Sequence, residues 1–102
     1  MRIKTMIHHI VLFKLKASVD KNSEAVKQAI AAMKILPQQV PQIRQWTSGE
    51  NFTQRSVAYD FGLYSTFDNQ ADLVVYAAHP EHVKVIEMWR AISDWNICDF
   101  AD

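Results

Sequence analysis

Seven consecutive residues, Tyr76 to His82, contain the side chains of this chain that are best suited to chemistry. They include two imidazoles, those of His79 and His82, and the phenol of Tyr76. A neutral histidine can remove a proton next to a carbonyl, and a phenol can donate a hydrogen bond to the oxygen on which negative charge then develops. We therefore take His82 as the candidate general base and Tyr76 as the candidate hydrogen-bond donor.

Pro80 determines how this segment is expected to fold. Because proline disfavours the α conformation in the preceding residue, a helix that carries Tyr76 should end at His79. Pro80 suits the first turn of a new helix, which places His82 near that helix's N-terminus. The partial positive charge there opposes protonation of an imidazole whose ordinary pKa is about 6.5, so His82 is expected to be neutral.

Each of these residues also has a purely structural interpretation. His82 would then be a helix residue whose ring bonds a backbone or side-chain partner, and Tyr76 an amphipathic core residue. The position of His79 before proline already explains its presence, and we keep it as an outer ligand-binding candidate. A positioned general base increases a reaction rate by about 10²–10⁴-fold, so His82 indicates an enzyme only if a substrate pocket accompanies it.

The elements that must position these side chains follow from hydrophobic periodicity. Residues 6–15 alternate with mostly apolar side chains on both faces, as in a strand covered on both sides, and His8 and His9 must point to opposite faces. A helix capped within residues 18–23 is expected to carry apolar residues at helical spacing and to end at Pro37. Its apolar residues are Val26, Ala29, Ile30, Met33 and Leu36.

The second half of the chain continues with strands at 42–51 and 59–67, joined by a polar turn. Asn69 should cap a short helix, with Asp72 at its third position. A further helix runs from Pro80 to about Ser93, and a last strand covers 95–101. The buried stripe of that helix is predicted to comprise Val83, Ile86, Trp89 and Ile92.

The resulting order, βαββαβ, predicts an α+β fold of the ferredoxin-like type, with both helical segments on one face of a four-stranded antiparallel sheet. Its length of 102 residues fits one domain, residues 1–102. Because the first strand is apolar on both faces, we expect the helix-free face to meet a second copy, closing a barrel around a cavity. The three tryptophans, Trp46, Trp89 and Trp95, are expected to be core or dimer anchors.

Composition excludes several classes of function. The 11 basic and 11 acidic residues balance, and no basic stripe interleaves with aromatics, which argues against nucleic acid as a partner. No apolar run approaches the roughly 20 residues that span a bilayer, and no signal-peptide pattern is seen, so no membrane partner is expected. Cys98 is the single cysteine, which suits a reducing compartment and predicts a cytoplasmic location.

Motifs for other chemistries are missing. The sequence contains no glycine-rich phosphate loop, nucleophile elbow or paired helical carboxylates, which removes nucleotide-dependent, serine-hydrolase and glycosidase mechanisms. His79 and His82 with Asp60, Cys98 or Asp99 do not form a diagnostic metal-ligand spacing. We predict no metal and no cofactor.

The chain resembles the stress-responsive dimeric α/β-barrel domain family over nearly its whole length. The resemblance rests on the strand 9–16, on Ile43 to Gly49 with Asn51, on Tyr59-Asp60, on Thr66-Phe67, on Tyr76 with His79 to His82, and on Asp99. It implies a homodimer in which two sheets form a barrel with the helices outside. A plant polyketide cyclase of this fold uses a histidine and a tyrosine that correspond to His82 and Tyr76, and a further histidine that corresponds to His9. This correspondence makes His9 a ligand-binding candidate and suggests a small apolar or polyketide-like ligand.

Two main hypotheses follow. In the first, a homodimeric barrel binds a small apolar ligand, with His82 and Tyr76 assisting proton transfer at a carbonyl as in a lyase or cyclase. In the second, the protein is a non-catalytic, stress-associated module whose barrel is filled by Phe13, Phe61, Phe67 and Trp46. A third alternative, a cofactor-free monooxygenase that handles haem or a polyketide-like aromatic, rests on fold analogy alone.

Overall fold

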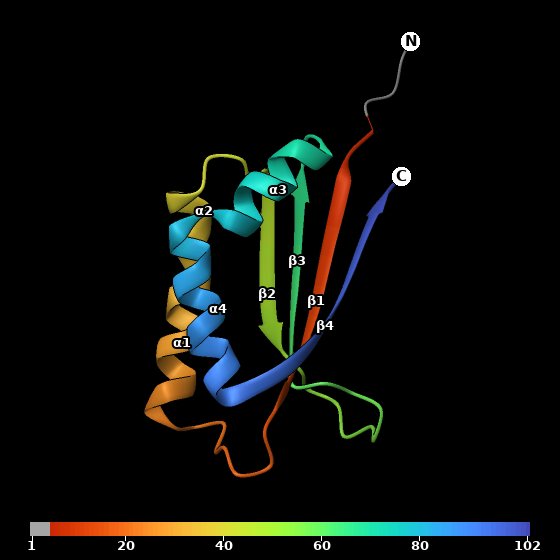
Figure 1. The fold of residues 1–102 in the computed structure, drawn as a ribbon. Coiled ribbons are helices and arrows are strands. Elements are labelled where there is room, and N and C mark those ends of the chain that lie inside the picture. The colour runs from red at the N-terminus through yellow and green to blue at the C-terminus, as the bar shows by residue number, and fades with distance from the viewer. Residues whose placement is uncertain (1–4) are drawn as a thin grey trace.

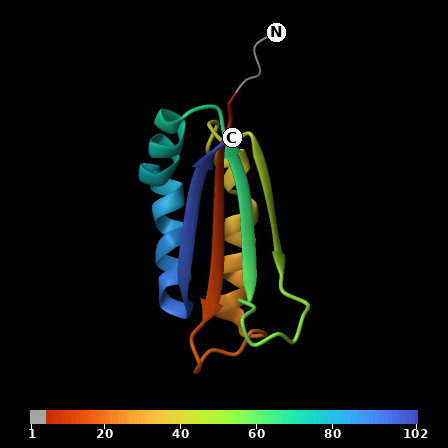
Figure 2. The same ribbon diagram turned by 90° about the vertical axis from the view of Figure 1, so that its right-hand side faces the viewer.

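A four-stranded antiparallel sheet carries all of the helices on one face (Figures 1 and 2). The structure is a computed structural model that describes residues 5–102. The strands lie in the order β2-β3-β1-β4, and every neighbouring pair is antiparallel. In chain order the elements are β1 (Ile7–Leu15), α1 (Glu24–Lys34), α2 (Leu36–Gln39), β2 (Gln45–Glu50), β3 (Phe61–Phe67), α3 (Gln70–Ala78), α4 (Pro80–Ile92) and β4 (Ser93–Ala101). This arrangement confirms the predicted α+β, ferredoxin-like fold.

Strand β1 lies in the interior of the sheet and divides its side chains strictly between the two faces. Ile7, Val11 and Phe13 are buried beneath the helices, whereas Leu12, on the other face, is 44% exposed. His9 is buried on the helix side with the odd-numbered residues, and His8 lies on the helix-free side. The predicted separation of the two histidines is therefore confirmed.

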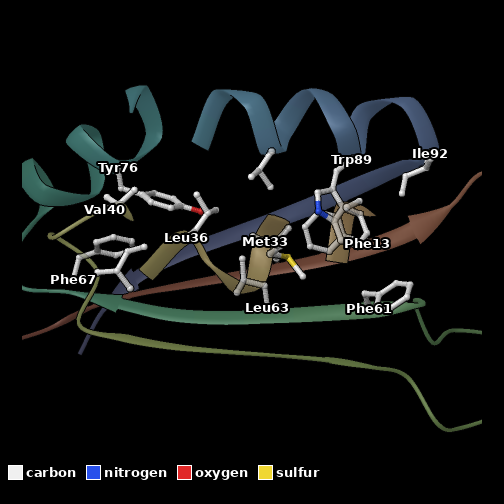
Figure 3. Close-up of a cluster of buried hydrophobic side chains, with 14 of the residues drawn as sticks. Phe13, Met33, Leu36, Val40, Phe61, Leu63, Phe67, Tyr76, Trp89 and Ile92 are labelled. Atoms are coloured by element: carbon white, nitrogen blue, oxygen red, sulfur yellow. The ribbon is translucent and has the colours of Figure 1, made fainter. Parts of the chain in front are cut away.

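The hydrophobic core lies between the sheet and the helices (Figure 3). The Trp89 ring of α4 packs at 4.3 Å from the Phe13 ring of β1 and at 5.5 Å from the Phe61 ring of β3, measured between centroids. Full burial of each large apolar side chain stabilises the fold by about 1.5–3 kcal/mol. Aromatic contacts between α4 and the sheet therefore hold the helix that carries His82.

The helix boundaries differ from the sequence prediction at Pro37. Ser23 caps α1 as predicted, its side chain accepting a hydrogen bond from the Val26 backbone N–H. The helix ends at Lys34, however, and Pro37 lies in the first turn of the separate short helix α2. The first turn of a helix tolerates proline because its N–H groups have no intrahelical acceptor.

The buried stripe of α4 is also shifted from the prediction. It consists of Val85, Trp89 and Ile92, whereas Val83 is 45% exposed and Ile86 is half-buried. With 3.6 residues per turn, Val83 lies roughly 120° around the helix from Trp89. The large indole of Trp89 fixes the buried face, and the smaller Val83 is left outside it.

The short helix α3 begins as the sequence predicts. The Asn69 side chain accepts a hydrogen bond from the Asp72 backbone N–H at 2.8 Å, and α3 ends where Pro80 opens α4. Within residues 5–102, no helix has the length and hydropathy needed to cross a membrane.

Candidate functional site

A cavity of about 390 Å³ lies between the sheet and the helices of the single chain. Its polar carboxylate, imidazole and phenol groups come from His9, Tyr76, His82 and Asp99, and the rest of its wall is apolar or aromatic. The sequence interpretation expected a cavity on the helix-free face, between two sheets; the cavity lined by these four residues lies instead beneath the helices. His9 faces the helices, so the three candidate residues can meet only on that side of the sheet.

Filling of the interior by bulky side chains is only partial. Phe61 and Phe67 belong to the buried core between sheet and helices. Phe13, which belongs to the same core, and Trp46 form part of the cavity wall and leave the space open. The available volume lies within the 300–1,000 Å³ range typical of ligand pockets.

His82 is held in one tautomer by the end of the preceding helix. Its Nδ1 lies 3.0 Å from the carbonyl oxygen of Ala77. Because a carbonyl oxygen only accepts, Nδ1 carries the proton and the neutral ring has its lone pair on Nε2. Helix α3 supplies the carbonyl and α4 the ring, so the break at Pro80 creates this contact.

The pKa of His82 is lowered from its ordinary value. Burial is the largest cause, and the nearby His9 and His79 rings act in the same direction, while the hydrogen bond to Ala77 partly opposes them. The sequence attributed a neutral ring to the positive end of the helix; the structure agrees on the direction but makes desolvation the main cause. A neutral His82 with a free Nε2 is chemically a base.

Tyr76 is the phenol nearest to that base. It extends from α3 into the space between the helices and the sheet (Figure 3), is only 2% exposed, and lies 4.1 Å from the His82 ring between centroids. Burial, reinforced by the nearby Asp99 carboxylate, raises the pKa of Tyr76 well above its usual value. The hydroxyl therefore keeps its proton and is available as a hydrogen-bond donor.

Asp99 is a member of the site that the sequence interpretation did not select. Asp99 of β4 is paired with His9 of β1, and His9 Nδ1 donates a hydrogen bond to Asp99 Oδ1 at 2.5 Å. The contact fixes the orientation of the His9 ring below Tyr76, whose centroid is 5.7 Å away. Pairing of the first and last strands was the available signal, since it places Asp99 opposite His9.

Four residues form a row across the helix side of the sheet, one from each strand. Trp46 pairs with Ser65, Ser65 with His9, and His9 with Asp99. The Ser65 hydroxyl and the Trp46 indole nitrogen are buried without a hydrogen-bond partner among the described residues. Tyr76 covers this row, with its ring 6.1 Å from that of Trp46. The row gives the cavity a polar floor beneath the phenol.

His79 serves the backbone at the helix break. It is the N-cap of α4, and its Nδ1 accepts a hydrogen bond from the Glu81 backbone N–H at 3.1 Å. It is not among the side chains that line the cavity. These contacts fit the structural interpretation of His79 and give no support to its prediction as a ligand-binding residue. Residues 5–102 also contain no cluster of three or more His, Cys, Asp or Glu side chains that could hold a metal ion.

The lowered pKa of His82 predicts how stability depends on pH. Because the unfolded imidazole titrates near 6.5 and the folded one below it, the unfolded state binds more protons in this window, and stability rises with pH through it. The loss of folding stability caused by His82 is complete below the pKa of the folded imidazole, and it is absent well above about pH 6.5. Replacing His82 with glutamine should therefore raise the melting temperature more at about pH 5 than at about pH 8. Thermal unfolding of both proteins at each pH tests this, and a difference that is independent of pH would contradict it.

These features define a class of protein: a ferredoxin-like α+β domain with an apolar cavity between sheet and helices. The sequence model of the Stress responsive A/B Barrel Domain (Dabb) matches residues 7–102, and the chain belongs to this family. It is 35% identical over 95 residues to a Streptomyces coelicolor protein of uncharacterised function, covering 93% of this chain and 98% of that protein. It is 33% identical over 82 residues to a stress-response A/B barrel domain-containing protein of Arabidopsis thaliana, covering 80% of this chain and 30% of that protein.

Solved structures share the fold over almost the whole chain. A dimeric ferredoxin-like protein of unknown function from Bacteroides fragilis has 32% identity and a TM-score of 0.82, covering 95% of this chain and 96% of that one. A dimeric ferredoxin-like protein of unknown function from Thermobifida fusca has 25% identity and a TM-score of 0.84, covering 96% and 92%. A hydroxynitrile lyase from Passiflora edulis has 20% identity and a TM-score of 0.81, covering 95% and 93%.

Proposed function

We propose that this protein binds a small, largely apolar carbonyl compound in the helix-side cavity and catalyses proton transfer on it, in a lyase- or cyclase-like reaction. The observation that carries the proposal is the pairing of two groups in opposite protonation roles. His82 is neutral with Nε2 free to accept a proton, while Tyr76, with its ring centroid 4.1 Å away, is held protonated as a donor. Two titratable groups whose environments push their pKa values apart are typical of acid–base sites.

The proposed step balances in protons and electrons. His82 Nε2 takes a proton from the carbon next to the carbonyl, and the C–H electron pair moves to form an enolate. Tyr76 stabilises the enolate oxygen with a hydrogen bond. The enolate carbon then attacks a second carbonyl carbon, as in a cyclase, and the alkoxide formed there takes the proton from His82. Alternatively, the enolate carbon takes that proton back. A lyase runs the related reverse step: His82 removes a hydroxyl proton, and the hydroxyl carbon becomes a carbonyl as the adjacent C–C bond breaks. The departing carbanion carries the C–C electron pair and takes the proton from His82.

The remaining wall of the cavity supports this assignment. Among the described residues that line the cavity none is Lys or Arg, and aliphatic and aromatic side chains make up most of the wall. A neutral, apolar substrate therefore fits better than a charged one. The hydroxynitrile lyase of Passiflora edulis has the same fold. Cleavage of a cyanohydrin to an aldehyde and cyanide is accordingly one reaction of the lyase type to test.

Hydrogen–deuterium exchange next to a ketone carbonyl tests the proposed proton transfer. Benzylacetone, a neutral aryl ketone, is incubated with the protein in heavy water, and proton NMR measures deuterium incorporation next to the carbonyl. We expect exchange well above that in protein-free buffer of the same pH. Saturation-transfer NMR on the same sample shows whether the ketone binds, and binding without accelerated exchange would argue against proton transfer.

The helix-free face of the sheet has the properties of a dimer interface, and we propose that the protein is a homodimer through it. Leu12 and Phe100 are 44% and 45% exposed there, next to the partly exposed Ile10 and Tyr64. His8 stacks on Phe100 at 4.8 Å between centroids and bonds the Tyr64 hydroxyl at 2.7 Å, which orders this face. The Bacteroides and Thermobifida proteins of this fold are dimeric.

A single charge should break this dimer. Sedimentation equilibrium of the unaltered protein should give twice the 11.8 kDa of one chain. Leu12→Lys should give the mass of one chain, because it would bury an unpaired ammonium group in the interface. The matched control Val57→Lys, at an exposed apolar residue outside the strands, should remain dimeric. A monomeric unaltered protein, or equal masses for the two variants, would contradict the proposed interface.

A further inference from the structure

The end of the cavity away from His82 contains a hydrogen-bond donor without an acceptor. The Trp89 side chain lines the cavity and is only 1% exposed, and its indole N–H has no partner among the described residues. Buried tryptophan N–H groups usually have an acceptor, and leaving one unpaired is destabilising. Neither the proton-transfer reaction nor core packing accounts for this donor.

The orientation of the indole shows where an acceptor would lie. In Figure 3 the indole nitrogen is on the edge of the ring that faces away from Ile92 and toward Met33. Met33 also lines the cavity. Methionine is unbranched and adapts its shape readily, so a bound molecule can displace its side chain and reach the N–H.

The two polar ends of the cavity lie at different levels along strand β1. Trp89 packs against Phe13, and His9 lies four residues earlier on the same strand. At a rise of about 3.3 Å per residue, the backbone positions of His9 and Phe13 are roughly 13 Å apart along β1. Val11, Leu63 and Val85 line the cavity between these ends and offer no polar side-chain group.

Charge further restricts the ligand. No cationic side chain lines the described cavity, and the Asp99 carboxylate lies at its polar floor, so an anionic group would be buried without compensation. Donors are present at both ends: the Tyr76 hydroxyl at one and the Trp89 N–H at the other.

We propose that the natural ligand is a neutral, elongated molecule with two oxygen acceptors joined by an apolar spacer. The first acceptor is the carbonyl at Tyr76 and His82, and the second is a carbonyl or ether oxygen that accepts from Trp89 Nε1–H. The role of the first acceptor rests on the proposed function; the contact at Trp89 does not. Trp89 is in this account a specificity-determining residue, and it takes no part in the proton transfer.

A pair of matched probes tests the second contact. Nonane-2,8-dione and nonan-2-one have the same chain length, and only the dione has a second acceptor. Calorimetry gives the ratio of their affinities for the unaltered protein and for Trp89→Phe, which keeps an aromatic ring but removes the N–H. We expect the ratio to fall by about tenfold in the variant, the effect of one hydrogen bond worth about 1.4 kcal/mol. Tyr64→Phe, which removes a hydroxyl from the helix-free face outside the cavity, should leave the ratio unchanged.

A second measurement does not depend on a folded variant. In ¹⁵N-labelled unaltered protein, the indole N–H signal of Trp89 should shift on addition of the dione but much less with the mono-ketone. Equal affinity ratios in all three proteins, a Trp89 signal that the bound dione leaves in place, or failure of both probes to bind would each overturn the proposal. None of these readouts requires turnover, so a dione that binds through Trp89 without deuterium exchange would refute the proposed reaction and leave this contact standing.

Discussion

Replacing His82 with glutamine is expected to slow deuterium exchange into benzylacetone by about 10²–10⁴-fold, the usual contribution of a positioned general base. The half-buried ring is held by one backbone hydrogen bond, to Ala77, and does not belong to the closed core. Its loss should therefore remove the base without unfolding the chain. Exchange rates measured by proton NMR at neutral pH, together with the melting temperature, test both parts of this expectation.

The matched control is His8→Gln, which removes an imidazole from the opposite face of the sheet. His8 contacts Tyr64 and Phe100 and does not reach the cavity. This variant should keep the full exchange rate at protein concentrations where it remains folded. Equal rates for the unaltered protein and His82→Gln, or equal losses in both histidine variants, would show that His82 is not the base.

Tyr76→Phe is expected to lower the exchange rate by about 10²–10³-fold, the effect of removing one donor from a developing oxyanion. The ring itself should stay in place, because it packs at 5.0 Å from Phe67 and 5.7 Å from His9 between centroids. Affinity for the ketone should change little, since the hydroxyl acts mainly on the charge that appears during the reaction. Initial exchange rates at saturating and at low ketone concentration distinguish a loss of catalytic rate from a loss of ketone affinity.

Tyr64→Phe removes a hydroxyl of the same kind from the helix-free face and should leave the rate unchanged. A loss confined to binding in Tyr76→Phe would make Tyr76 a ligand contact without a catalytic role. The raised pKa of Tyr76 adds a further expectation: the rate should show no alkaline decline from this group at about pH 10, where an ordinary tyrosine ionises.

Much of the fold could be predicted because its signals are local. Alternation in 6–15 gave the interior strand, the pair Asn69 and Asp72 gave the start of α3, and Pro80 gave the junction with α4. Each depends on backbone preferences within a few residues, and the structure reproduces all three. The junction also brings Tyr76 and His82 to adjacent turns, so these two candidates were found together.

The location of the cavity required information that local patterns do not contain. Both faces of β1 are largely apolar, so the sequence did not show which face would be covered by helices and which by a second copy. The contact between His9 and Asp99 joins residues 90 positions apart, and it becomes visible only once β1 and β4 are paired. The unpaired N–H of Trp89 likewise depends on how the whole core packs around it.

The central claim is that a neutral imidazole faces a cavity that accepts carbonyl compounds, and ¹⁵N NMR of the His82 ring tests it most directly. A pH titration should give a pKa below about 6.5 and, at neutral pH, the tautomer with the proton on Nδ1. Addition of benzylacetone should shift the Nε2 signal while the His8 ring is unaffected. A His82 ring that is protonated at neutral pH, or an Nε2 signal that the bound ketone does not change, would contradict the account.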